Sequence, residues 1–526
     1  MPHRLSTLSA KIAATAAVIC LVEALVIDAA AFLWTAALGW IVALIATRPA
    51  LRRSRAALVA LAAATLFVAA MFDDPSPLAV LLFLVAIVLA ALLPRRRFDT
   101  AIAWGLRLIW AGLSALLLPI RDVALTARVR TRRARPGIRP GAVAAMLVLP
   151  VAGGALFLTL FAQANPLIEW AFAGMVLPDI GVVLCRGVIA IVVLLPVWAT
   201  LRPDPRSTAW DGALPALALP QTGIATLILS LATFNTIFAI QNALDLAFLW
   251  SGAPLPAGVT MADYAHRGAY ALIVTALLAG LFVLVTLRPG SPGAASVAVR
   301  RLVTLWIVQT LLLVASSALR TLDYVDAYSM TVLRLSALIW MALVATGLVL
   351  ILWRLLAGQS SAWLVNANAL AAALVLTGCT LVDLRATAAA WNVDTAIRRH
   401  TPLADLDLCY LADLGPSAIL PLARLEQATR DPAARDAIAS IRWEAQRTLT
   451  AQQGSSRDWS WRGARRLARV QAMMGATPPR LRAAPDGRRC GIIEPPPQSA
   501  PPAPAPAGQW TKARLTKAPL TKAAQR

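Results

Sequence analysis

Long apolar segments without a single ionised side chain constrain this chain more than any other feature. The clearest of them cover residues 142–163, 222–243, 268–287 and 302–319. A helix in a water-soluble core needs one polar face, so lipid or other apolar helices must surround these segments. Roughly eleven runs of membrane-spanning length fill residues 12–382. The sequence therefore predicts an all-α polytopic transmembrane helical bundle.

The charge balance is strongly basic and consists mainly of arginine. Lys and Arg number 49 against 26 Asp and Glu, although charged residues make up only 14% of the chain. Such a balance can indicate nucleic acid, but here the arginines stand at the ends of apolar runs. The expected partners are the lipid bilayer and its anionic headgroups, with no nucleic acid. The Arg- and Ala-rich, Lys-poor composition suggests a high-GC bacterium, and with the apolar runs it gives the inner (plasma) membrane as the expected location.

Arginine at the ends of the apolar runs predicts which side each connection faces, because short cytoplasmic loops retain Lys and Arg. Residues 1–98 read as an N-terminal four-span unit with a cytoplasmic N-terminus. Arg48 and the run Arg95-Arg96-Arg97 mark inner connections, whereas the proline-broken turn with Asp73 and Asp74 marks an outer one.

Residues 99–140 depart from this pattern. Arg107 lies inside the apolar run 101–120, and seven arginines follow from Arg121 to Arg139. A crossing would place this basic stretch outside, so we expect an interfacial helix on the inner leaflet and a basic cytoplasmic loop. Anionic lipids are expected along residues 94–139, where an ordinary solvated basic loop is the alternative.

Seven further spans are expected in residues 141–382. The total of about eleven spans plus one interfacial helix sends the C-terminal region outside the cytoplasm. That region comprises an extramembrane helical part, 383–491, and a Pro/Ala-rich disordered tail, 492–526. Its excess of Lys and Arg opposes this orientation, but the charge rule weakens for long segments. One span more or fewer would reverse the assignment.

The extramembrane part has local signals for helices. Pro416 after Gly415 can begin one helix, and Asp431 with Pro432 provides an N-cap and a first-turn proline for the next. In that second helix Ile438, Ile441, Ala445 and Leu449 share one face. The pair predicts a helical hairpin that covers the bundle mouth or binds a partner.

Two further observations concern aromatic and sulfur side chains of the same region. Trp459 and Trp461 mark either core packing or a membrane-surface contact. Cys409 and Cys490 allow one disulfide bridge.

Polar residues inside the predicted spans form the candidate site, because such groups are costly in hydrocarbon and are usually paired. The cluster comprises Asn235, Asn242, Asp245, Arg320, Tyr324 and Arg334. The first three share a helix face at spacings of seven and three residues, and the last three form one stripe if residues 320–334 are helical. We predict that Asp245 pairs with Arg320 or Arg334. Interhelical hydrogen bonding without any ligand is the alternative.

Several segments in combination resemble a known family. They are Tyr264-Ala265-His266-Arg267-Gly268, the run from Arg320 to Arg334 with Tyr328-Ser329-Met330-Thr331 inside it, Asn392-Val393-Asp394, Asp407-Leu408-Cys409-Tyr410-Leu411 and residues 416–422. Over about residues 140–470 the chain resembles an uncharacterised bacterial membrane family, domain of unknown function 4173. Ser329-Met330 departs from the Gly-Leu of the family pattern. The resemblance implies a fold and a membrane location, and it brings no activity.

No catalytic, metal-binding or nucleotide-binding motif stands out. His3, His266 and His400 are too few and too separated to suggest a metal site, and no paired catalytic carboxylates occur in or near the spans. We expect no cofactor and no catalytic residue, and an intramembrane enzyme is the weakest of three hypotheses.

Two other hypotheses remain. The preferred one is a non-enzymatic membrane binding, signalling or assembly component. The alternative is a transporter of a small solute that uses polar residues of the 221–354 helices. A polar cavity at mid-membrane favours transport, whereas a solid bundle favours the first.

Overall fold

A computed structural model of the chain describes most of the apolar segments and the region that follows them. The described residues are 2–26, 32–133, 150, 153–154, 180–209, 223–247, 278, 282, 296–402, 405–479, 488–489 and 492–493. Their regular structure is helical apart from one antiparallel pair of two-residue strands, β1 (Arg488–Arg489) and β2 (Ile492–Ile493). The predicted all-α class is therefore confirmed for this part of the chain.

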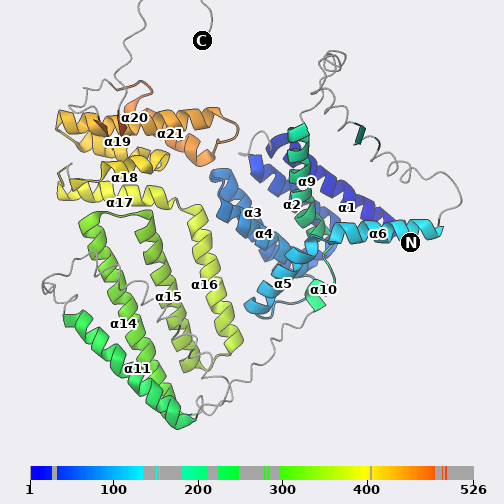
Figure 1. Cartoon of the computed structure of the whole chain (residues 1–526), viewed down its shortest axis with the longest axis horizontal. Coiled ribbons are helices and arrows are strands. Elements are labelled where there is room, and N and C mark those ends of the chain that lie inside the picture. Colours follow the sequence, from blue (N-terminus) through cyan, green and yellow to red (C-terminus); the bar gives the residue numbers. More distant parts are fainter. Residues whose placement is uncertain are drawn as a thin grey trace, which may run out of the picture.

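The N-terminal group begins with helices that run back and forth beside one another (Figure 1). Its elements are α1 (Pro2–Leu21), the π-helical turn η1 (Val22–Val26), α2 (Leu33–Thr47), the 3-10 turn η3 (Pro49–Arg53), α3 (Arg55–Asp73), α4 (Pro77–Leu92), α5 (Ala101–Ala115) and α6 (Leu118–Arg133). Side-chain caps begin three of them, because the Ser54, Ser76 and Thr100 hydroxyls accept hydrogen bonds from amides of the first turns. These bonds satisfy donors that a helix start leaves free.

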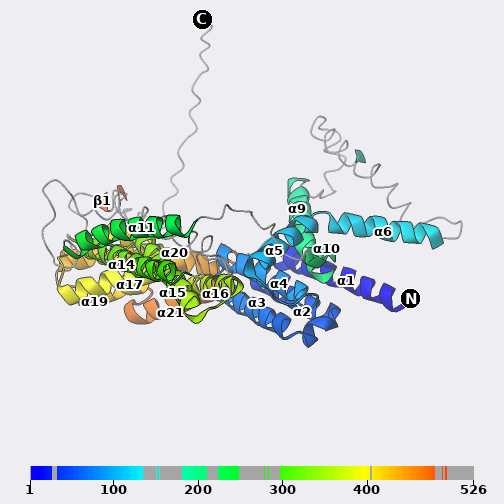
Figure 2. The same ribbon diagram turned by 90° about the horizontal axis from the view of Figure 1, so that it is seen from below.

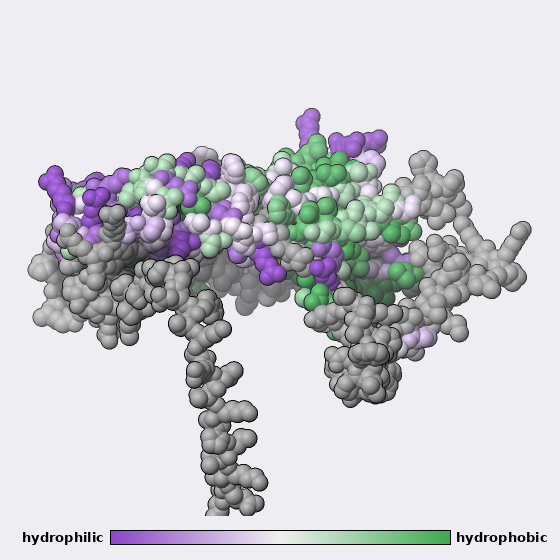
Figure 3. Space-filling view, turned by 90° about the horizontal axis from the view of Figure 1, so that it is seen from above, coloured by the Kyte–Doolittle hydropathy of each residue, from purple (hydrophilic) through white to green (hydrophobic). Residues whose placement is uncertain are grey.

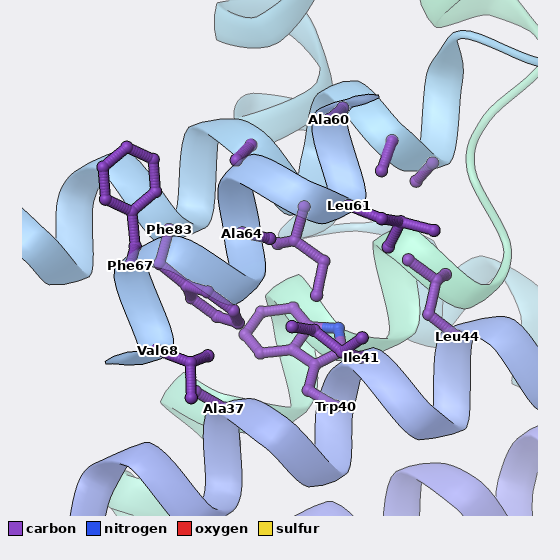
Figure 4. Close-up of a cluster of buried hydrophobic side chains, with 14 of the residues drawn as sticks. Ala37, Trp40, Ile41, Leu44, Ala60, Leu61, Ala64, Phe67, Val68 and Phe83 are labelled. Carbon is purple, nitrogen blue, oxygen red and sulfur yellow. The ribbon is translucent and has the colours of Figure 1, made fainter. Parts of the chain in front are cut away.

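Apolar side chains of α2, α3 and α4 form the core of this group. Trp40 and Leu44 of α2 pack against Leu61 and Phe67 of α3 and Phe83 of α4 (Figure 4). Interleaved alanines on the facing surfaces allow the helix backbones to approach closely, as is usual between membrane helices.

Two later helices complete the same core. Val197 and Leu201 of α9 (Ile180–Leu201) and Trp104 of α5 belong to the cluster. The packing unit thus extends beyond residue 98 to helices that are distant in sequence.

A buried arginine ties the ends of α2, α4 and α9 together. The guanidinium of Arg48 donates to the carbonyl oxygens of Ala91, at 2.7 Å, and Thr200, at 2.9 Å. These carbonyls lie in the last turns of α4 and α9, where a positive charge is favourable. Burial, together with the nearby charge of Arg95, lowers the pKa of Arg48 to about 10. We call this the arginine end of the bundle.

A second group of helices lies beside the first along the long axis of the molecule (Figures 1 and 2). It consists of α11 (Ile224–Asp245), α14 (Val297–Tyr328), α15 (Val332–Ala357) and α16 (Ser361–Leu381). Asn366 of α16 links the groups, since its side chain accepts from the Ala101 amide, at 2.8 Å, and donates to the Asp99 carbonyl, at 2.9 Å.

The region after α16 folds into a helical domain that lies across the ends of α14, α15 and α16 (Figure 1). Its helices are α17 (Leu384–Arg399), α18 (Leu408–Asp413), the 3-10 turn η6 (Gly415–Ala418), α19 (Ile419–Ala428), α20 (Pro432–Gly454) and α21 (Trp461–Met474). We call it the tail domain. Asp431 caps α20 through the Ala434 amide, and Ile438, Ala445 and Leu449 are buried. The predicted start and apolar face of this helix are confirmed, and the domain also includes α17, α18 and α21.

Seven described helices are long and apolar enough to cross a membrane, as expected of a multi-pass membrane protein. The bent pair α5–α6 can add one more. The predicted count of about eleven is therefore not confirmed. One reason is that α2 and α4, with 15 and 16 residues, are shorter than the usual span. Another reason is that the predicted spans near residues 141–163 and 268–287 fall mostly outside the described residues.

The predicted interfacial segment contains two helices, with a bend of 56° between Ala115 and Leu118. Pro119 follows the bend, and proline interrupts helical hydrogen bonding. Helix α6 runs crosswise to α14–α16 (Figure 1). Arg107 of this segment is 1% exposed and bonds both carboxylate oxygens of Asp99, so a carboxylate already neutralises this arginine.

Candidate functional site

The predicted polar residues of α11 face α14 along one line. Asn235 donates to the Leu302 carbonyl at 3.1 Å, and Asn242 donates to the Gln309 carbonyl at 3.2 Å. Both bonds join residues 67 positions apart, so the two helices run parallel and repeat their contact after seven residues. A seven-residue repeat keeps the same faces of two helices in contact.

Gln309 is a member of this line that sequence reasoning missed. Its side-chain amide donates to Asn235 Oδ1 at 2.7 Å. The available signal was an uncharged amide seven residues after Leu302, inside an otherwise apolar span. An uncharged Gln draws less attention than an ionised group, although it is also costly in hydrocarbon.

Asp245 and Arg320 form a buried ion pair at the end of this line. The Arg320 guanidinium donates to Asp245 Oδ1, and the Gln241 amide donates to the same oxygen at 3.1 Å. The carboxylate residue is 1% exposed and the arginine 7%. The prediction that Asp245 pairs with one of the two arginines is confirmed, with Arg320 as the partner.

Several oxygens along the line lack a donor among the described residues. They are Asn242 Oδ1, Asp245 Oδ2 and Gln309 Oε1. Buried acceptors of this kind are rare and each calls for a physical explanation. The line is therefore mainly interhelical hydrogen bonding, with spare acceptor capacity on α11 and α14.

Tyr324 and Arg334 belong to a different site, at the turn between α14 and α15. The guanidinium of Arg334 lies 4.2 Å from the centre of the Tyr324 ring and donates to the Tyr328 carbonyl at 2.7 Å. The predicted helical stripe is wrong here, because α14 ends at Tyr328 and Ser329 turns the chain away. The six candidates thus divide into the α11–α14 line and this turn.

Ser329 adopts a backbone conformation that glycine favours. Its φ is +68° and its ψ is 162°, a region that costs other residues about 1–3 kcal/mol. Bonds to neighbours hold it there: Asn392 of the tail domain accepts from the Met330 amide, at 2.6 Å, and donates to the Met330 carbonyl, at 2.9 Å.

We predict that Ser329→Gly stabilises the protein by about 1 kcal/mol. Glycine adopts this backbone conformation without strain, but it also increases the conformational entropy of the unfolded chain, which offsets part of the stabilisation. Thermal unfolding of the detergent-solubilised protein measures the effect. Ser336→Gly, on an exposed position within α15, is the matched control and should destabilise by about 1 kcal/mol. A loss of stability in Ser329→Gly would contradict the strain.

The same turn attaches the tail domain to the second group of helices. Besides the two bonds of Asn392, the Tyr410 hydroxyl of α18 accepts from the Val332 amide at 2.8 Å. Val325 and Met330 pack with Ala388 of α17. A turn between two spans is therefore also a docking site for two helices of the tail domain.

Arginines of α21 attach the tail domain to the first group. Arg462 bonds Asp73 at 2.8 Å and Asp74 at 3.1 Å, in the turn between α3 and α4. Arg465 also pairs with Asp73. Phe72 beside them packs on the Trp461 ring, with centroids 5.7 Å apart. Trp461 is nevertheless 44% exposed, so it stacks on Phe72 at the surface and is not part of a buried core.

Asp383 joins the start of α17 to α21. Its carboxylate accepts from the Ala386 amide at 3.0 Å, from the Ser417 hydroxyl at 2.9 Å and from Arg466. Burial alone would raise its pKa, but these bonds outweigh burial and lower it. For Asp74, burial is the larger influence and raises the pKa despite Arg462. We call this side of the molecule the acidic end.

Side chains that can ligate a metal ion are dispersed over the described residues. No group of three or more His, Cys, Asp or Glu side chains there is placed to hold a metal. Cys20, Cys185 and Cys379 are free thiols, whereas Cys409 is disulfide-bonded. Its predicted partner, Cys490, lies outside the described residues.

Comparison with known proteins gives one match. The family model of a domain of unknown function, DUF4153, matches residues 56–425. The chain belongs to the DUF4153 family. The matched DUF4153 region runs from α3 to α19, so it leaves out α1 and α2 but includes the rest of the first group, the second group and its junction with the tail domain. No curated protein and no solved structure matches the chain.

This match corrects the resemblance proposed from the sequence. The family is DUF4153 and not domain of unknown function 4173, although both descriptions concern domains of unknown function. That resemblance was placed over about residues 140–470 and rested on short segments from Tyr264 onward, whereas the DUF4153 match already begins at residue 56. Polar turns and span boundaries of a few residues recur in many membrane proteins, so they do not separate such families.

Proposed function

We propose that this DUF4153 protein is a non-enzymatic membrane scaffold that holds its tail domain at the outer surface of the bacterial inner membrane for a protein partner. The observation that carries the proposal is the two-sided attachment of the tail domain. Asn392 and Tyr410 bind the turn between α14 and α15, and Arg462 binds the turn between α3 and α4. A domain attached to both groups has a defined orientation relative to the bilayer.

The α11–α14 line also supports this role over transport. Asn235 and Asn242 bond to carbonyl oxygens of α14, and Asp245 is neutralised by Arg320. Polar groups that satisfy one another between helices act as structural glue. A solute path needs groups that are available to a solute.

The disulfide of Cys409 supports an outside location of the tail domain. Disulfides persist in the periplasm and outside cells, whereas cytosolic thiols stay reduced. The arginine end, with Arg48 and Arg95, lies at the opposite ends of the helices from Asp73 and Asp74. Arginine-rich connections favour the cytoplasm. The disulfide and the arginine distribution therefore both favour a location of the tail domain outside the cytoplasm.

The directions of the described helices support the proposed count of eleven spans. Helix α4 ends at the arginine end and α9 begins at the acidic end. Helix α11 ends toward the acidic end, at Asp245, and α14 begins at the arginine end. Eleven spans, an odd number, give the tail domain the side opposite the N-terminus.

The surface of the tail domain suits a partner protein better than lipid. Viewed from above, hydrophilic residues gather over this part of the molecule, whereas apolar residues predominate over the N-terminal group (Figure 3). Glu444 and Arg447 on α20 are more than half exposed. Exposed charges of this kind are costly in lipid, and arginine is enriched in protein interfaces.

We predict that a cysteine at Ala451, next to Gln452 on α20, reacts with an impermeant maleimide on intact spheroplasts. The free thiols Cys20, Cys185 and Cys379 are first replaced by serine, and the Cys409 disulfide is kept. A cysteine at Arg53, exposed at the arginine end, is the matched control and should react only after lysis. The reverse pattern would overturn the orientation.

The partner is tested with a photo-crosslinking amino acid at Ala433 or Arg447, both exposed on α20. We expect a discrete protein adduct from these positions and none from Leu370, which is exposed on the apolar surface of α16. Adducts at all three positions, or at none, would count against a scaffold with a specific partner.

Transport of a small solute is the second candidate function. It is favoured by the acceptor oxygens of Asn242 and Asp245 that lack donors among the described residues. An uptake or current in proteoliposomes that Asp245→Asn abolishes in folded protein would support transport and displace the scaffold proposal.

A further inference from the structure

An apolar groove lies between α1, α6 and α9, near the arginine end. Its volume is about 350 Å³, and its apolar walls include Leu8, Ile12 and Ile19 of α1, Val123 of α6 and Leu194 of α9. Ile12 and Val123 are more than half exposed, so the groove opens to the surroundings of the bundle. In a bilayer, an apolar groove of this kind fits a hydrocarbon chain.

One end of the groove is polar and ordered. Asp122, 3% exposed, accepts from the Trp198 indole at 3.0 Å and lies 3.3 Å from the Arg202 guanidinium. Arg121 binds Asp204 at 3.2 Å. Carboxylates thus hold the arginines of this end in place, while the Arg202 side chain remains 37% exposed.

Positive charge predominates around this polar end. Lys11 shares a face of α1 with Leu8, Ile12 and Thr15, which line the groove. Among the described residues, Lys11 interacts electrostatically with the three arginines Arg48, Arg95 and Arg202 and with a single carboxylate, Asp122. Three cations beside a lysine leave a surplus that an anion can neutralise. The described residues therefore combine an apolar groove with a basic mouth.

We propose that this groove holds one acyl chain of an anionic phospholipid, with the lipid phosphate between Lys11 and Arg202. Charge complementarity selects the headgroup, because basic residues at the membrane surface attract anionic lipids. The apolar walls select a lipid over a free anion. The site is independent of the proposed scaffold role, since it lies at the end opposite the tail domain.

Native mass spectrometry of the full-length protein in detergent tests the site. The protein is titrated with phosphatidylglycerol, with phosphatidylcholine of the same acyl chains, and with inorganic phosphate alone. We expect one tightly retained phosphatidylglycerol, weaker retention of phosphatidylcholine, and no competition from phosphate. Lys11→Gln should weaken phosphatidylglycerol binding about fivefold, which is the contribution of one basic residue near an anionic surface.

Two pairs of variants distinguish the contribution of the apolar groove to lipid binding from that of the basic residues at its polar end. Ala16→Phe fills the groove and should reduce binding of both lipids, whereas Ala13→Phe, exposed on α1 and absent from the groove, should not. Arg53→Gln, an exposed arginine away from the groove, controls for Lys11→Gln. Equal affinity for both lipids would contradict selection of an anionic headgroup. Displacement of the lipid by phosphate would contradict binding of a lipid in preference to a free anion. Unchanged lipid binding in Ala16→Phe would contradict the groove as the binding site.

Discussion

Asp245→Asn should destabilise the detergent-solubilised protein by about 3–5 kcal/mol. The substitution removes the negative charge beside Arg320, and an ion buried without its counter-charge carries the full cost of desolvation. Asp245 and Arg320 are 1% and 7% exposed, so water cannot replace the lost partner. A simple interhelical hydrogen bond in a membrane protein contributes only about 0.6 kcal/mol on average. The size of the loss therefore distinguishes an ion pair from an ordinary polar contact.

A double-mutant cycle measures the pair directly. Arg320→Gln alone should also destabilise strongly, and Asp245→Asn with Arg320→Gln should recover part of the loss, because no unpaired charge then remains. Thr236→Val, at an exposed position of α11, is the control and should change stability by less than about 0.5 kcal/mol. Additive losses in the cycle would refute direct pairing.

Arg442→Met should unfold or loosen the tail domain, at a cost of about 3–5 kcal/mol. Arg442 is 2% exposed and bonds Glu426 at 2.6 Å and Gln446 at 2.7 Å. Gln446 in turn donates to the Gly475 carbonyl, at 3.0 Å, just after α21. The substitution leaves the Glu426 carboxylate buried without its cation and disconnects α19, α20 and the end of α21. Limited proteolysis and thermal unfolding of the full-length protein report the effect.

A matched pair on the same helix provides the control. Arg447 and Glu444 also form an ion pair, but their side chains are 70% and 61% exposed. Arg447→Met should therefore cost less than about 0.5 kcal/mol, since solvent screens exposed pairs. Combining Arg442→Met with Glu426→Leu should restore much of the stability, because an apolar pair of similar volume replaces a buried ion pair well. Failure of that rescue would mean that Arg442 acts through contacts other than Glu426.

The candidate site was partly predictable because charge is visible in a sequence. An ionised residue inside an apolar run needs a partner, and this requirement alone indicated an arginine for Asp245. The choice of Arg320 over Arg334 depended on the break at Ser329, which a helical spacing argument does not contain. Gln309 was missed because it is uncharged, and its bond to Asn235 follows only from the parallel register of α11 and α14.

For Arg107, too, the sequence did not identify the partner of a charged side chain. In the sequence it is one of several arginines near a membrane surface, and anionic lipid was the expected counter-charge. The structure places Asp99 against it in a two-bond pair, whose hydrogen bonds lower the pKa of Asp99 to about 2. The position of a charge within an apolar run predicts that the charge needs a partner. The geometry of the neighbouring helices decides which group that partner is.

The sequence by itself determined that the chain forms apolar helices, where many of them begin, and that α20 has a buried face. Caps, prolines and apolar periodicity act over a few residues, so they can be recognised in the sequence without knowledge of the tertiary structure. Only the tertiary structure decided that α9 completes the N-terminal core, and that α21 binds Asp73 and Asp74 across more than 380 positions. Periodicity reveals that a face is buried, but the burial partner depends on packing between segments that are distant in the chain.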